Sequence, residues 1–565
     1  MLRALAKWLA KNQYYFDTNF LQRMKNVFLT MALIGVNLAA FSQSFTMSNL
    51  PIVVLNTNGK QIVNEPKVMV DMKIIYNGVG KMNLLTDTKY DYQGKIGIEF
   101  RGSTSQDLFP KKPYGFETWD NAGKSINVSV LGLPAESDWI FYPSYNDKTL
   151  MNNVFVMKMA RDMGGMYSSR TQYVEMVLDN QYMGVYVLME KIKRDTNRVN
   201  VTKIEPKDVA GNALTGGYIF KIDKTTGSDK EGWASKIAPS AGNGKINYLY
   251  DTPKAADLAL EQRNYLRAYV DSAEAALMAP NFQDKTNGFR RFYDAESFVK
   301  MFLINEVTRN VDGYRISTFF SKDRTSKGGK IKAGPPWDYD ITLGNADYCQ
   351  GFSTTGWAYQ FGMVCPDDFW QVPVLWQRML SDTAYVTSLR REYLRLRAGV
   401  WNTTKLHANI DSIATLLSDA QTRNFVKWPV LGQKIWPNPS PVPATYPAQI
   451  MAMKTWIAAR LNWLDQNMPG AILSTETPVG ESAVLVEASP NPVSNTLRVR
   501  IQSPARADAF VEVVSSQGQI MNTQFVELSQ GENTVEITAN HWSIGVYALR
   551  IHSTLGVVTR KIIKI

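Results

Sequence analysis

The sequence contains few of the residues that most nucleophile and metal chemistries need. Its 565 residues include only two cysteines and three histidines. The histidines, His407, His541 and His552, are scattered, which excludes a Ser-His-Asp or Cys-His enzyme. A zinc site at the cysteines is not expected, because no histidine lies near them in the chain. Lys/Arg-rich runs of the kind that bind nucleic acid are also missing, although the net charge of +11 suits a phosphate-bearing ligand.

Apolar runs long enough to cross a membrane comfortably are missing too. The longest candidate, Val27–Phe41, follows Met24-Lys25-Asn26 and ends in small residues, which predicts a secretory signal peptide within an N-terminal extension of residues 1–43. We expect translation to start at Met24 and no transmembrane helix to remain after cleavage. The alternative is an uncleaved membrane anchor.

The rest of the composition is that of a folded, multidomain protein. Hydrophobic residues make up 45% and aromatic residues 11%, which is typical of well-packed globular chains. A chain of this length exceeds one hydrophobic core, so two or more domains are expected. Cys349 and Cys365 lie in one loop, and in an exported protein such a local pair predicts a disulfide. Two free, buried thiols are the alternative.

The chemistry concentrates between Asn310 and Gly344. Asp312 lies in an Asn-Val-Asp-Gly turn, and a strand-like run and a Gly-Gly hairpin separate it from Trp337-Asp338-Tyr339-Asp340. Two carboxylate groups of this kind suit metal-assisted group transfer, although Asp in Gly-rich turns is also a common turn former. If this run is extended, Asp338 and Asp340 lie on the same side of it.

A second polar segment follows a predicted strand that ends at Phe100. It reads Arg101-Gly102-Ser103-Thr104-Ser105-Gln106 and leads to Lys111-Lys112, which we expect on the next strand. Backbone N–H groups of such a loop, with a neighbouring lysine, can hold nucleotide phosphates. On its own, the segment also fits a surface hairpin.

Periodicity places helices and strands around these segments. Strands are predicted at 52–55, 68–75 and 96–100, and a hairpin over Asp179-Asn180 at 174–190. Apolar spacing predicts a helix from Asp147, as N-cap, to Met163. Further helices are expected at 254–279, 294–309, 370–398, 405–422 and 446–467.

Together these segments resemble the CotH (spore coat protein H) kinase family, atypical kinases of the secretory pathway. The resemblance covers about residues 85–400 and includes Phe100–Glu117, Tyr145–Gly164 and Val174–Asp195. It implies an α+β, atypical protein-kinase-like, two-lobe fold over residues 44–470. The N-terminal lobe would span about residues 50–200 and the C-terminal lobe about 210–470.

The resemblance also implies an activity and its residues. The protein would transfer the γ-phosphate of ATP to Ser/Thr hydroxyls of an unidentified protein, with Mg²⁺ or Mn²⁺ as metal. Asp312 would be the catalytic carboxylate, and Asp338, Asp340 and Ser317 the candidate metal ligands. The candidate nucleotide-binding residues are Arg101, Ser103, Thr104, Lys112, Glu190 and Lys221.

Several features depart from ordinary protein kinases. Ser317 stands where kinases have a magnesium-binding asparagine, and no His-Arg pair precedes Asp312. The helix expected at 147–163 carries no glutamate to pair with a strand lysine. A non-catalytic kinase-like surface scaffold therefore remains an alternative. So does a glycosidase that uses Asp312 with Asp338 or Asp340.

The C-terminal part differs in composition. Residues 471–484 form a linker rich in Ser, Thr, Pro and Gly, and 485–565 predict short strands joined by turns. Ser489-Pro490-Asn491-Pro492, Gly545-Val546-Tyr547 and the last strand, 558–565, resemble the sorting domain of type IX secretion cargo, a small β-sandwich. This resemblance implies the type IX secretion machinery as a partner, and export through the periplasm to the outer-membrane surface or the medium. An adhesion-like β-sandwich is the alternative.

Overall fold

The computed structural model describes residues 45–102, 104–225, 231–242, 244–470, 484–515, 520–553 and 555–565. The expected signal peptide, Ser103 and residues 471–483 of the expected linker lie outside these ranges. The chain mixes helix (28%) and strand (29%) and ends in a strand-rich domain. Within the described ranges, no helix combines the length and the apolar character that a membrane span requires.

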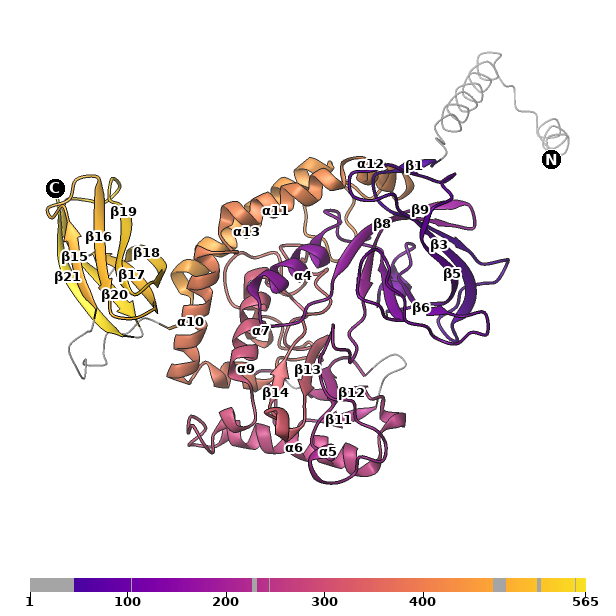
Figure 1. Ribbon diagram of the computed structural model, residues 1–565, viewed down its shortest axis with the longest axis horizontal. Coiled ribbons are helices and arrows are strands. Elements are labelled where there is room, and N and C mark those ends of the chain that lie inside the picture. The colour runs from indigo at the N-terminus through magenta and orange to yellow at the C-terminus, as the bar shows by residue number, and fades with distance from the viewer. Residues whose placement is uncertain are drawn as a thin grey trace, which may run out of the picture. The chain divides into compact units, whose positions relative to one another are not determined.

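Seven strands in the first part of the chain close into a barrel (Figure 1). They are β2 (Ile52–Asn56), β3 (Val68–Ile75), β5 (Tyr90–Phe100), β6 (Tyr114–Trp119), β7 (Asp138–Tyr142), β8 (Thr171–Leu178) and β9 (Gln181–Glu190). The order around the barrel is β2-β3-β5-β6-β7-β9-β8, and parallel pairing of β2 with β8 completes the ring. Closure pairs the strand edges, so the barrel leaves none of these strands as a free edge.

Local sequence explains much of this barrel. Asp179 and Asn180 join β8 to β9 and both have positive φ angles, 46° and 63°, which Asp and Asn tolerate better than most residues. The predicted strands at 52–55 and 68–75 coincide with β2 and β3. The short helix α3 (Thr104–Leu108) follows β5, and Lys112 lies two residues before β6 begins rather than on the strand.

A five-stranded sheet forms the second part of the chain, in the order β11-β12-β10-β13-β14. Its strands are β10 (Tyr218–Ile222), β11 (Gly232–Ala234), β12 (Asn247–Thr252), β13 (Thr318–Lys322) and β14 (Ile331–Ala333). The hairpin β13–β14 places Phe320 opposite Ala333. Because Pro335 and Pro336 follow β14 and lack backbone N–H donors, the ladder cannot continue into the acidic run.

Helices surround this sheet and share one large hydrophobic core with it. They are α4 (Asn152–Met163), α5 (Gly211–Leu214), α6 (Leu260–Met278), α7 (Ala295–Thr308), α8 (Phe361–Val364), α9 (Val374–Met379), α10 (Thr383–Ala398), α11 (Thr403–Leu416), α12 (Ser418–Lys427) and α13 (Tyr446–Asn467). Short 3-10 helices lie at 255–257, 289–291, 325–327, 348–350 and 358–360.

Several expectations about local structure were wrong. The helix expected at 370–398 is two helices, α9 and α10. The helix predicted from Asp147 begins at Asn152; the Asp147 carboxylate instead accepts the Asn152 N–H, at 2.8 Å, from outside the helix. The acidic run is a loop rather than a strand, because Asp338 has a left-handed backbone, φ 65°. Alternation along an extended strand therefore does not decide where Asp338 and Asp340 point.

The C-terminal domain consists of two antiparallel sheets around one apolar core, a β-sandwich. Its strands are β15 (Leu485–Ser489), β16 (Thr496–Ser503), β17 (Ala507–Ser515), β18 (Ile520–Leu528), β19 (Gly531–Thr538), β20 (Gly545–Ser553) and β21 (Gly556–Lys564). Along β16, buried Leu497 and Val499 alternate with exposed Arg498, the period of two that a half-buried strand requires.

A small separate unit comprises residues 45–47 and 84–87 among the described residues. Within it the Leu85 N–H donates to the Thr46 carbonyl at 2.9 Å. The short strands β1 (Met47–Ser48) and β4 (Asn83–Leu84) begin or end in it.

Candidate functional site

Carboxylates from three segments converge beside the β10–β13 strand pair. Asp312 follows α7, Asp338 and Asp340 follow β14, and Asp223 directly follows β10. The Ser317 hydroxyl lies 3.4 Å from the Asp338 carboxylate, and the Ser317 N–H donates to Asp223 at 3.4 Å. Ser317 therefore links two of these carboxylates.

Burial and the repulsion of neighbouring carboxylates both act on the pKa of Asp338. Asp338 as a whole residue is exposed. The protein packed around it and the charges of Asp340 and Asp312 nevertheless raise its pKa well above the ordinary value. Arg101 acts in the opposite direction, and Asp223 adds a further repulsive charge. A nearby cation would therefore stabilise the ionised form.

Asp340 is held by two asparagines that precede or begin α4. The Asn146 side-chain amide donates to its carboxylate at 3.2 Å, and the Asn152 amide donates to its backbone carbonyl at 3.1 Å. Burial and the charge of Asp312 raise the pKa of Asp340, while the hydrogen bond from Asn146 opposes the rise. The helix predicted at 147–163 thus supports the acidic loop through amides rather than through a glutamate.

Asp312 has a different environment. Its backbone N–H donates to the Asn310 side chain at 3.1 Å, and its carboxylate pairs with Arg315 at 2.7 Å. The carboxylate remains partly accessible, with 17% of the side chain exposed. It is thus fixed on one side and open on the other.

Arg101 brings the predicted phosphate-binding loop to this site. Its guanidinium carbon lies 5.7 Å from the centre of the Trp337 ring, and Asp338 favours its charged form. Thr104, at the start of α3, lies 3.5 Å from the ammonium of Lys224. The structure therefore places Arg101 and Thr104 next to basic and acidic groups of the second sheet.

Lys221, on β10, contacts one member of the carboxylate group. Its ammonium pairs with Asp223 at 3.1 Å and lies 5.5 Å from the centre of the Phe319 ring. Asp223 was not singled out from the sequence, and neither was Asn146. A Lys-x-Asp pattern at a strand end was the available signal for Asp223, whereas the sequence around Asn146 offered none.

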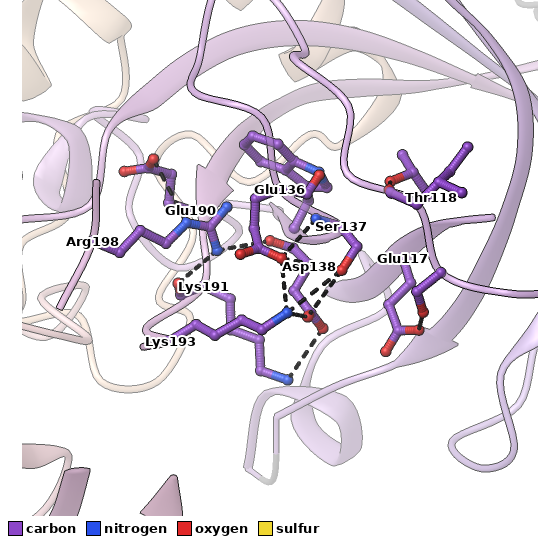
Figure 2. Close-up of polar contacts among 12 residues, drawn as sticks. Glu117, Thr118, Glu136, Ser137, Asp138, Glu190, Lys191, Lys193 and Arg198 are labelled. Carbon is purple, nitrogen blue, oxygen red and sulfur yellow. Dashed lines mark hydrogen bonds and ion pairs between the residues drawn. The ribbon is translucent and has the colours of Figure 1, made fainter. Parts of the chain in front are cut away.

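Lys112 and Glu190 lie in other environments. The Lys112 ammonium donates to the carbonyl of Gln106, within α3. Glu190 is completely buried at the end of β9, where it accepts from Arg170 at 3.0 Å and lies 3.7 Å from Arg198 (Figure 2). Neither side chain is brought to the carboxylate group by a contact of the described residues.

Lys191, a basic residue next to Glu190, was not predicted from the sequence as part of a site. Figure 2 shows Lys191 beside Asp138, at 3.8 Å, while Lys193 pairs with both Glu136 and Asp138. The surrounding protein lowers the pKa of Lys191, and the positive charges of Lys254 and Arg101 contribute to that shift. Lys191 is thus paired with Asp138 of the barrel rather than with a carboxylate of the candidate site.

The donor set suits a hard divalent cation. Its members are carboxylates, one side-chain amide and one hydroxyl, and oxygen donors of this kind are preferred by Mg²⁺ and Mn²⁺. Across the ranges that the structure describes, no three His, Cys, Asp or Glu side chains form a ready-made metal cage. Two carboxylates completed by substrate phosphates are the usual way in which proteins bind Mg²⁺, so the residues present fit such an ion.

The loop after the acidic run is closed by a disulfide between Cys349 and Cys365, which are 16 residues apart. Arg315 extends from the Asp312 loop to this region, where it pairs at 3.2 Å with Asp368, three residues after Cys365. The disulfide segment is therefore linked to Asp312 through one arginine.

Comparison with known families assigns the chain to a family. The family described as CotH kinase protein matches residues 98–464, which is well over half of the chain. The chain therefore belongs to the CotH kinase protein family. A comparison with curated proteins finds no match for it.

A second family, the secretion system C-terminal sorting domain, matches residues 488–565. This match covers the β-sandwich and confirms the resemblance seen in the sequence. It indicates export by type IX secretion to the cell surface or beyond, with the type IX machinery as a partner.

Proposed function

We propose that this protein is a secreted atypical kinase that transfers the γ-phosphate of ATP to Ser/Thr hydroxyls of a protein. Residues 50–200 and 210–470 would form the two lobes of its kinase-like fold. The observation that carries the proposal is the position of Arg101, from the barrel, beside the loop after β14. Its guanidinium carbon lies 5.7 Å from the centre of the Trp337 ring, and its charge opposes the rise in the pKa of Asp338. Membership of the CotH kinase protein family supports it.

Each group has a chemical role in this proposal. A divalent ion, when bound, would neutralise phosphate oxygens, and Asp338 and Asp340 would hold it with help from Ser317. Arg101 and Lys221 would bind phosphate oxygens through charge-assisted hydrogen bonds. Asp312 would orient the acceptor hydroxyl and take its proton as the hydroxyl oxygen attacks phosphorus and the bond to ADP breaks.

A thermal-shift titration with ATP and Mg²⁺ or Mn²⁺ tests the proposal. Ligand that binds only the folded state at about 100 times its Kd adds about 2.7 kcal/mol of stability. We expect this metal-dependent shift in the purified protein and its loss in the Asp338→Asn/Asp340→Asn double variant. The exposed pair Asp411→Asn/Asp419→Asn is the matched control and is expected to keep the shift.

A titration without any shift would have a different meaning. Folded protein that shows no shift with any nucleotide or metal would contradict the kinase proposal. The non-catalytic surface scaffold would then be the better explanation of the fold.

A further inference from the structure

One buried arginine joins Asp312 to the segment that the disulfide closes. Only 3% of the Arg315 side chain is exposed. One terminal nitrogen lies 2.7 Å from the Asp312 carboxylate, and the other lies 3.2 Å from the Asp368 carboxylate. Its Nε donates to the Val311 carbonyl at 2.8 Å. Arg315 therefore bridges two carboxylates and the backbone beside Asp312.

The rest of the arginine's surroundings come from the segment 348–370, which we call the arginine cage. The guanidinium carbon lies 4.0 Å from the centre of the Phe361 ring and 5.8 Å from that of Tyr348. The Trp370 carbonyl accepts a hydrogen bond at 3.2 Å. The Tyr348 hydroxyl donates to the second oxygen of Asp368, which orients that carboxylate.

The disulfide joins the two halves of the arginine cage. Cys349 directly follows Tyr348, and Cys365 lies between Phe361 and Asp368. Without the bond, the two halves would be joined only through the intervening chain, so loop closure would cost more conformational entropy. The acidic loop has other supports, since Asn146 and Asn152 hold Asp340.

We propose that Arg315 is a positioning residue for Asp312, and that the Cys349–Cys365 disulfide makes this positioning depend on the redox state of the compartment. The inference rests on the proposed kinase function. Two-electron reduction by a dithiol would convert the disulfide into two thiols and oxidise the dithiol, loosening the arginine cage. Phosphoryl transfer would then slow while nucleotide and metal binding persist, so the enzyme would be completed only after export to an oxidising compartment.

Arginine variants test the positioning role. We expect Arg315→Gln to lower kcat by about 100-fold, the cost of a misplacement of about 1 Å, while KM for ATP changes less than about twofold. Arg315→Lys should recover part of kcat, because an ammonium can keep one ion pair but not the forked geometry. Transfer is measured from labelled ATP into the chain itself and into dephosphorylated casein.

Arg290→Gln is the matched control, because Arg290 pairs with Asp382 through two contacts of 2.7 Å away from the site. It should lower stability without changing kcat. Parallel loss of kcat and of ATP binding in Arg315→Gln would show a merely structural role and overturn the proposal.

The redox link is tested with a Cys349→Ser/Cys365→Ser double variant and with dithiothreitol-treated wild type. Both are expected to lose at least about tenfold in kcat and to keep the metal-dependent ATP shift. Unchanged kcat in both would overturn the redox link.

Amide hydrogen exchange gives a readout that needs no activity. Exchange over residues 309–317 should accelerate in Arg315→Gln, in Cys349→Ser/Cys365→Ser and in reduced wild type. Exchange over 335–342 should stay unchanged in all three. Unchanged exchange at 309–317 would overturn the inference even if no kinase activity exists. Accelerated exchange without any ATP binding by wild type would instead mean that the kinase proposal fails and the positioning contact is real.

Discussion

A buried ion pair joins Glu306 of α7 to Arg460 of α13. Both side chains are completely buried, with Nη2 and Oε2 3.1 Å apart. The Glu306 carboxylate also accepts from the N–H groups of Ala358 and Tyr359, at 2.8 and 2.9 Å, and from the Tyr314 hydroxyl at 3.0 Å. One carboxylate therefore joins α7 and α13 to Tyr314, two residues after Asp312, and to the 3-10 helix at 358–360.

Arg460 is satisfied in a similar way. Its Nε donates to the Glu306 carbonyl at 2.8 Å, and one terminal nitrogen donates to the Gly356 carbonyl at 2.7 Å. Burial lowers the pKa of Arg460 to about 10, which still leaves it charged at neutral pH. Burial raises the pKa of Glu306, while Arg460 opposes that rise. The ionised form of Glu306 and that of Arg460 thus stabilise each other.

Replacing Glu306 by Gln removes one charge and leaves the other buried. Breaking a buried ion pair in this way typically costs about 3–5 kcal/mol. For a domain of this size, each kcal/mol lowers Tm by about 2 °C, so we expect a decrease of about 6–10 °C. Urea and thermal unfolding measure the change.

The partly exposed pair of Glu392 with Arg395 supplies the control, and Glu392→Gln should cost less than about 1 kcal/mol. The double variant Glu306→Gln/Arg460→Met should cost less than the two single variants together, because no charge remains buried. The reasoning is refuted if Glu306→Gln costs no more than the control, or if the two single costs simply add.

Two further predictions concern pH. Burial lowers the pKa of Lys322 from 10.5 to about 8, so between these values the unfolded state binds more protons and stability rises with pH. Urea unfolding should be measured at several pH values between 8 and 10.5. As pH rises, the free energy of unfolding of wild type should increase relative to that of Lys322→Met, by at most about 1.4 kcal/mol per pH unit. A pH-independent difference would contradict this. Burial lowers the pKa of His552 from 6.5 to about 4, so the β-sandwich should lose stability as pH falls between these values, and His552→Phe should remove that loss. The unfolding transition of the β-sandwich is the one that is missing from a chain truncated after residue 470. Equal acid sensitivity of this transition in wild type and His552→Phe would count against burial of a neutral His552.

Local patterns predicted the elements that depend on nearby residues. The helix expected at 446–467 has the bounds of α13, because Thr445 caps it, an N-terminal proline suits the first turn, and apolar spacing continues to its end. The helix expected at 294–309 is α7, capped by the Asp294 carboxylate. The single helix expected at 405–422 is instead two helices, α11 and α12, which meet at Leu417.

Local patterns did not predict contacts between segments that are distant in the sequence. Parallel pairing of β2 with β8 joins residues more than a hundred positions apart, and no local signal specifies it. Asp223 and Asn146 reach the acidic loop only because the second sheet and α4 are packed around it.

The sequence by itself determined the family and the export route, and it singled out three candidate carboxylates. Asp312, Asp338 and Asp340 stand in recognisable segments, and the sorting domain has its own motifs. Only the tertiary structure decided how these residues are arranged. It bends the acidic run into a left-handed turn at Asp338, and it holds Asp312 with an arginine that the disulfide segment encloses. The physical reason is that side-chain direction and charge pairing depend on which distant segments are packed together, and short-range periodicity carries no record of that packing.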